Sequence, residues 1–106
     1  MKADGLAIHE ATENGRRIIH LAGELDLRSA ARLEHRLSQL TAAQTEIVLE
    51  LSQLAFIDST GIALIIRAAQ AAHQHNGRLE LRDPTPAVRR VLDLCRVEAV
   101  LKPPRT

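Results

Sequence analysis

The sequence predicts an α/β fold, a mixed and mostly parallel sheet of four to five strands with an antiparallel N-terminal hairpin and three helices packed on it. Strand and helix patterns alternate along the chain, which is typical of parallel strand–helix–strand units. Asn14-Gly15, a strong hairpin turn signal, separates the first two apolar runs. The length of 106 residues suits one hydrophobic core, so we expect a single domain over residues 1–106 with an ordered core of about 6–101.

The first half of the chain is expected to form two strands, a helix and a third strand: Leu6–Ile8, Arg16–Ala22, Arg28–Leu40 and Glu46–Leu51. The first two strands flank the hairpin turn, and we expect the second strand to end at the Gly23–Asp26 segment. Apolar residues at spacings of three and four predict the helix. Leucine and β-branched residues in the third strand are typical of a strand buried in a sheet.

The second half is expected to form the longest helix, a strand, a third helix and a last short strand: Ser59–His75, Arg78–Arg82, Pro86–Cys95 and Ala99–Leu101. Asn76-Gly77 is a typical helix stop, and the strand after it alternates apolar and charged residues. The third helix has an apolar stripe that includes Cys95, which predicts a buried thiol. We expect order to end at Pro103-Pro104.

Composition argues against several classes of function. The net charge is +1 and Phe56 is the only aromatic residue, so the chain lacks the basic field and the stacking platforms of nucleic-acid binding. The N-terminus has no apolar signal-peptide core, and no apolar stretch approaches a membrane span. A single cysteine excludes an internal disulfide. We therefore expect a cytoplasmic protein with no direct nucleic-acid partner and no membrane insertion.

One polar cluster interrupts an apolar run: Asp58-Ser59-Thr60-Gly61, between Phe56-Ile57 and Ile62. Helix capping alone accounts for it, because Asp and Ser side chains accept hydrogen bonds from first-turn N–H groups. A cap residue can also be exposed and modified. In parallel strand–helix units, every strand-to-helix loop lies at the same sheet edge. The Gly23–Asp26 segment and this cluster are both such loops, so we expect them to lie together.

No catalytic constellation accompanies the cluster. Ser59 lacks the G-x-S-x-G nucleophile elbow, and no glycine-rich phosphate loop is present. Asp26 and Asp58 could form a carboxylate pair, but nothing else catalytic comes with it. We expect His20 to lie in a strand and the other histidines to lie on the surface. His73 and His75 are two positions apart in a helix, so they are on different faces and do not share a metal. We expect a binding module rather than an enzyme, with no catalytic residue, no cofactor and no metal site.

Three stretches resemble the STAS domain family, named for sulfate transporters and anti-sigma factor antagonists. They are Ile47–Ile62 with its Asp58-Ser59-Thr60-Gly61 core, Leu21–Asp26 ahead of a helix, and Pro84–Leu92. The resemblance covers residues 6 to 101. Free-standing bacterial members with this Asp-Ser-Ser/Thr-Gly motif resemble anti-sigma factor antagonists.

The resemblance implies a partner-switching cycle in transcription regulation and stress response. The unphosphorylated antagonist binds an anti-sigma factor serine kinase and releases a sigma factor. The kinase phosphorylates the serine after the aspartate, here Ser59, and the phosphorylated form dissociates until a serine phosphatase restores it. The partner-binding residues that the resemblance implies are Gly23, Glu24, Leu25, Asp26, Asp58, Ser59, Thr60 and Gly61.

The resemblance leaves an alternative open. Many antagonists continue past the last strand into another amphipathic helix, whereas this sequence stops at Thr106 after Pro103-Pro104. Short ends of this kind also occur in the STAS subunits of bacterial phospholipid-transport ABC complexes. Such a subunit binds the ATPase of its complex and need not be phosphorylated.

Overall fold

In the computed structural model, which describes residues 4–101, eight elements follow one another along the chain. They are β1 (Leu6–Glu13), β2 (Arg16–Leu25), α1 (Ala30–Ala42), β3 (Glu46–Ile57), α2 (Ser59–Gln74), β4 (Arg78–Arg82), α3 (Pro86–Leu94) and α4 (Val97–Leu101). The strands form one sheet in the order β1-β2-β3-β4, antiparallel between β1 and β2 and parallel elsewhere. This confirms the predicted mixed sheet with its N-terminal hairpin.

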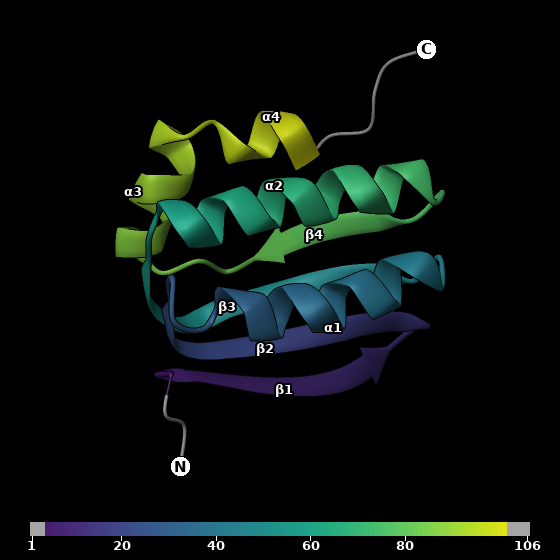
Figure 1. Ribbon diagram of the computed structural model, residues 1–106, viewed down its shortest axis with the longest axis horizontal. Helices are drawn as coiled ribbons and strands as arrows, with labels where there is room; N and C mark the ends of the chain where they lie inside the picture. Colours follow the sequence, from purple (N-terminus) through teal and green to yellow (C-terminus); the bar gives the residue numbers. More distant parts are fainter. Residues whose placement is uncertain (1–3, 102–106) are drawn as a thin grey trace.

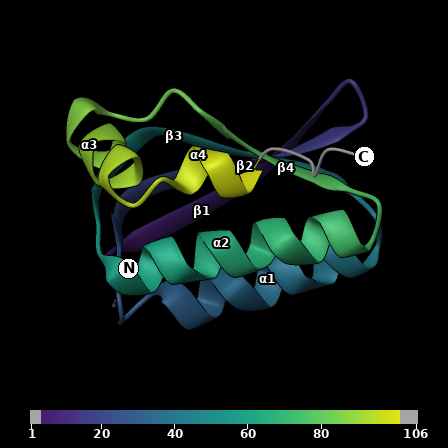
Figure 2. The same cartoon turned by 90° about the horizontal axis from the view of Figure 1, so that it is seen from above.

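The two long helices, α1 and α2, lie side by side on one face of the sheet (Figures 1 and 2). Between the helices and the sheet lies one hydrophobic core, in which Leu21, Leu49 and Leu64 are fully buried. The apolar stripe of α1, predicted from its spacing, faces this core with Leu33, Leu37 and Leu40. No helix of residues 4–101 is long and apolar enough to cross a membrane.

The first three strands are longer than the sequence predicts. β2 does not break at Gly23 but continues to Leu25, and β3 continues past Leu51 to Ile57. While β2 advances from His20 to Glu24, β3 advances from Glu50 to Phe56, so β3 contains two extra residues at irregularities in the pairing. From Leu51 onward, every third residue of β3 is buried instead of every second, and simple alternation therefore misses this second half of the strand.

The turn before α1 displaces that helix by two residues from its expected start, and α3 ends one residue early. Cys95 is consequently the C-cap residue of α3 and is exposed, so the prediction of a buried thiol is wrong. The next residue, Arg96, has a φ of 53°, which turns the chain away from the helix.

The expected last strand at Ala99–Leu101 is also wrong, because these residues belong to α4. α4 packs against α2, α3 and β4, and its first residue, Val97, is fully buried. A short apolar run cannot be assigned to helix or strand by periodicity alone, and here the packing site decides. The described residues thus contain four helices rather than three. The expected end of order at Pro103-Pro104 lies outside them.

Candidate functional site

The ends of β2 and β3 meet at one edge of the sheet. Leu25 and Ile57 are partners in the parallel ladder, and the backbone N–H of Asp58 donates to the carbonyl oxygen of Leu25 at 3.2 Å. The loop after β2 and the first turn of α2 therefore lie next to each other, as the topology predicts. Asp26 follows directly after Leu25, so the two polar motifs begin at neighbouring strand ends.

Gly61 allows α2 to approach this strand end closely. It is buried in the first turn of the helix, and a Cβ atom there would lie 2.9 Å from both Cγ and the carbonyl oxygen of Leu25 and 2.8 Å from Cγ1 of Ile57. These separations are shorter than van der Waals contact, so any side chain would push the helix away from β2. Close packing of α2 against the ends of β2 and β3 therefore requires glycine at position 61.

Asp58 and Ser59 have different roles in the structure. Asp58 is the N-cap of α2, and its Oδ1 accepts from the backbone N–H of Gly61 at 3.0 Å. Ser59 is the first helical residue and is exposed. No hydrogen bond among residues 4–101 engages its hydroxyl. The capping explanation of the cluster is thus correct for Asp58 alone, and Ser59 is exposed without taking part in the cap.

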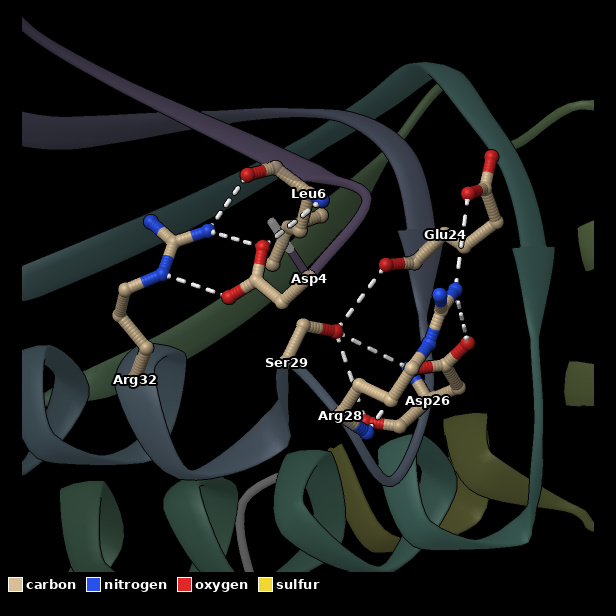
Figure 3. A network of polar contacts seen from close by, with 7 residues as sticks. All are labelled: Asp4, Leu6, Glu24, Asp26, Arg28, Ser29 and Arg32. Atoms are coloured by element: carbon tan, nitrogen blue, oxygen red, sulfur yellow. Dashed lines mark hydrogen bonds and ion pairs between the residues drawn. The ribbon is translucent and has the colours of Figure 1, made fainter. Parts of the chain in front are cut away.

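The loop between β2 and α1 is held by a buried serine that the sequence interpretation did not single out (Figure 3). The hydroxyl of Ser29 donates to the carbonyl oxygen of Glu24 at 3.0 Å and accepts from the backbone N–H of Asp26 at 3.2 Å. Ser29 is fully buried, so these bonds fix the backbone of the loop from beneath. The signal in the sequence that could have identified Ser29 is its position directly before Ala30, the first apolar residue of the helical spacing.

Three carboxylates lie at this edge: Glu24 near the end of β2, Asp26 directly after the strand, and Asp58 at the N-cap of α2. Arg28 is a cation that pairs with two of them. Arg28 lies 3.1 Å from Asp26 and 3.9 Å from Glu24 (Figure 3). The hydrogen bond from Arg28 lowers the pKa of the Asp26 carboxyl, and in turn the pKa of Arg28 is raised. The surface therefore carries an excess of negative charge at neutral pH, with Asp26 ionised.

Gly23 and Gly5 allow the backbone of the N-terminal segment to lie close to the end of β2. Gly23 has a φ of +101°, and a Cβ atom there would overlap the carbonyl oxygen of Gly5. That carbonyl accepts from the backbone N–H of Glu24 at 3.0 Å. Close by, Arg32 of α1 holds Asp4 at 2.9 Å (Figure 3). Gly23 thus has a positional role at the loop, alongside its predicted role in partner binding.

Two exposed apolar side chains flank the motifs, and the sequence interpretation did not select them. Leu27 lies in the loop after β2 and is 78% exposed, and Phe56 lies beside Glu24 near the end of β3 and is 50% exposed. Exposed large apolar residues beside polar motifs are typical of protein interfaces. Only their exposure in the folded protein distinguishes Leu27 and Phe56 from the apolar residues of the core.

The side chains at this edge define the chemistry that it offers. Neither loop contains a histidine, so the Ser59 hydroxyl has no imidazole base within the loops. Among residues 4–101, no three His, Cys, Asp or Glu side chains form a group that could hold a metal ion. The edge offers an accessible hydroxyl, a helix N-terminus, acidic groups and two apolar side chains.

Comparison with known proteins identifies the family and gives related proteins of one named function. The family model described as "Mlab, STAS domain" matches residues 8–102. An anti-sigma F factor antagonist of Paenibacillus polymyxa is 32% identical over 91 residues, which are 84% of this chain and 78% of that protein. The anti-sigma-F factor antagonist RsfB of Mycobacterium tuberculosis is 29% identical over 72 residues, 67% of this chain and 59% of that protein.

Solved structures share the fold. An anti-sigma factor antagonist from Mycobacterium paratuberculosis superposes with a TM-score of 0.80 at 20% identity, over 99% of this chain and 90% of that one. The anti-sigma factor antagonist SpoIIAA in its unphosphorylated form has a TM-score of 0.76 at 23% identity, over 93% and 89% of the two chains. Bacillus SpoIIAA in its phosphorylated form has a TM-score of 0.71 at 22% identity, over 93% and 92%.

Proposed function

The chain belongs to the STAS domain family, and from this premise we propose that it is an anti-sigma factor antagonist. The unphosphorylated protein binds an anti-sigma factor serine kinase and thereby releases a sigma factor. Phosphorylation of Ser59 switches this binding off, and a serine phosphatase restores it. The protein acts as a regulatory binding partner and not as an enzyme. The names of the relatives in Paenibacillus polymyxa and Mycobacterium tuberculosis support this assignment.

The observation that carries the proposal is the division of roles between Asp58 and Ser59. Asp58 satisfies the N–H of Gly61, while the Ser59 hydroxyl is exposed on the first turn of α2. A kinase can therefore reach the oxygen without disrupting the cap. A phosphate there adds a charge of about −1.5 to −2 at the positive end of the helix, which favours an anion by about 0.3–1 kcal/mol.

The docking surface in this proposal consists of Gly23–Asp26 at the end of β2 and Asp58–Gly61 at the start of α2, with Leu27 and Phe56 beside them. The apolar side chains supply contact area, and the carboxylates of Glu24, Asp26 and Asp58 favour a partner with lysine or arginine opposite them. A phosphate added in the middle of this acidic surface raises its negative charge further. Release then follows from desolvation of the phosphate at the interface rather than from unfolding of the antagonist.

The direct test is phosphorylation by a purified candidate anti-sigma factor kinase with ATP and Mg²⁺, followed by peptide mass spectrometry. We expect one phosphate per chain, on Ser59, and none in the Ser59→Ala variant. Ser38→Ala is the matched control, because Ser38 is an exposed serine on α1 and should leave the modification intact. Phosphate on Ser38 or Thr60, or none with every candidate kinase, would contradict the assignment of Ser59.

A second candidate function has one observation in its favour. The matching family model is described as Mlab and not as an antagonist. This supports a STAS subunit of a bacterial phospholipid-transport ABC complex, which would bind the ATPase subunit constitutively through the same sheet edge. Co-purification distinguishes the two functions: a stable complex with an ABC ATPase that ATP and Ser59→Asp leave intact supports the transport subunit, and dissociation on phosphorylation supports the antagonist.

A further inference from the structure

Two histidines face each other across the N-terminal hairpin. His9 of β1 and His20 of β2 are direct partners in the antiparallel ladder. Their ring centroids lie 6.0 Å apart, with the ring planes tilted by 53°. His20 alternates with Ile19 and Leu21, which belong to the core, so both imidazoles project from the sheet face opposite α1 and α2. His9 is exposed and His20 is half-buried.

The neighbour of His20 on the next strand is Glu50, whose carboxylate is already hydrogen-bonded. Glu50 of β3 is the register partner of His20 and is buried. One carboxylate oxygen accepts from Nε of Arg82 at 2.8 Å, and the other accepts from the backbone N–H of Ser52 at 3.0 Å. The Arg82 bond helps to lower the pKa of Glu50 against the opposing effect of burial. Glu50 is therefore a charge-balanced neighbour rather than a free ligand.

The imidazole nitrogens themselves are available. No hydrogen bond within the part of the chain that the structure describes engages a ring nitrogen of His9 or His20. The residues two positions away on the same face are Ala7, Ala11, Ile18 and Ala22. These small or apolar side chains carry no donor or acceptor that competes for the rings.

We propose that His9 and His20 form a chelating site for a divalent late transition metal ion of the Zn²⁺, Ni²⁺ and Cu²⁺ class. Imidazole nitrogen suits these ions and not Mg²⁺ or Ca²⁺. With metal–nitrogen bonds of about 2 Å, two imidazoles on one ion have ring centres about 5–6 Å apart, so small side-chain rotations from the present geometry suffice. The hairpin ladder fixes the backbone beneath both rings.

The site supplies two protein ligands, and water or a group from another molecule fills the remaining positions. Such a site has open coordination positions, unlike the closed four-ligand site of a structural zinc. Because the ion bridges β1 and β2, it binds the folded hairpin more tightly than the unfolded chain. Metal should therefore raise the melting temperature as its concentration exceeds the dissociation constant.

The test uses Zn²⁺ and the full chain in a Cys95→Ser background, because Cys95 is exposed and would compete for the ion. Calorimetric titration should give one site per chain, and imidazole nitrogen NMR signals of His9 and His20 should shift together. His9→Ala and His20→Ala should each lower the affinity tenfold or more, and the double variant should lose little beyond either single variant, as chelation requires.

His35→Ala is the matched control, since His35 is exposed on α1 and distant in the fold from the hairpin face. This variant should bind Zn²⁺ as tightly as the parent protein. The proposal is overturned if the His9 and His20 variants bind within twofold of the parent, or if the NMR shifts occur at His35, His73 or His75 instead. The NMR result on the parent protein decides the question even if a variant proves unstable.

Discussion

The backbone N–H of Asp58 donates a hydrogen bond of 3.2 Å to the carbonyl oxygen of Leu25, a residue distant in sequence. This bond extends the ladder between β2 and β3 to the point where both chains leave the sheet. It brings the acidic loop after β2 against the first turn of the helix that carries Ser59. The candidate docking surface exists because these two strand ends coincide.

Ser59→Asp should weaken binding to the anti-sigma factor kinase tenfold or more, which corresponds to about 1.4 kcal/mol. The fold should not change, because the added carboxylate lies at the favourable end of α2 and opposes only the partly exposed carboxylates beside it. Titration of the kinase measures the affinity, and amide NMR spectra and thermal melts check the fold. Ser38→Asp on α1 is the control. Unchanged affinity, or a rearranged free protein, would argue against the proposed switch.

Gly61→Ala should destabilise the domain by about 1–3 kcal/mol, through overlap with Leu25 and Ile57. Helix propensity alone predicts the reverse, a gain of about 1 kcal/mol. Urea unfolding measures the difference, and Ala63→Gly at an exposed position of the same helix calibrates the propensity contribution. If Gly61→Ala raises the unfolding free energy, the close packing of α2 on the end of β2 is not a constraint.

Gly23→Ala should cost more stability than Gly15→Ala. Both glycines have positive φ, +101° and +80°, so both substitutions strain the backbone. Only at Gly23 does the new methyl group overlap the carbonyl of Gly5, whereas no atom lies within 4 Å of it at Gly15. Paired urea unfolding curves give the difference directly. Equal losses would mean that strain alone accounts for the need for glycine at position 23.

The ion pair of Asp4 and Arg32 should make stability depend on pH in the acid range. The hydrogen bonds from Arg32 and the backbone N–H of Leu6 lower the pKa of Asp4 from 3.8 to about 2. Because the folded state prefers the charged carboxylate, this contribution is present above about pH 4 and is lost as the pH falls toward 2. Unfolding free energies measured from pH 6 to pH 2 should fall less steeply in Arg32→Met. Parallel curves would show that the pair contributes no pH dependence.

Local patterns in the sequence were enough for the type of every element up to α3 and for much of the topology. The Asn14-Gly15 turn fixes the hairpin, and the spacing of apolar residues fixes the buried face of α1. The alternation of strands and helices predicts that the two polar loops meet at one edge, because parallel strands end on the same side. The family motif identified Ser59 as a candidate without any coordinates.

Features that depend on near neighbours in the chain, such as turns, helix periodicity and the order of the elements, could therefore be predicted without coordinates. The tertiary structure alone decided the bulges of β3, the exposure of Cys95, and the folding of Ala99–Leu101 as helix α4. The tertiary structure also showed that Asp58 and not Ser59 caps α2, and that the rings of His9 and His20 lie near each other. The physical reason is that burial, register and side-chain partners are set by residues distant in sequence, which a local pattern does not contain.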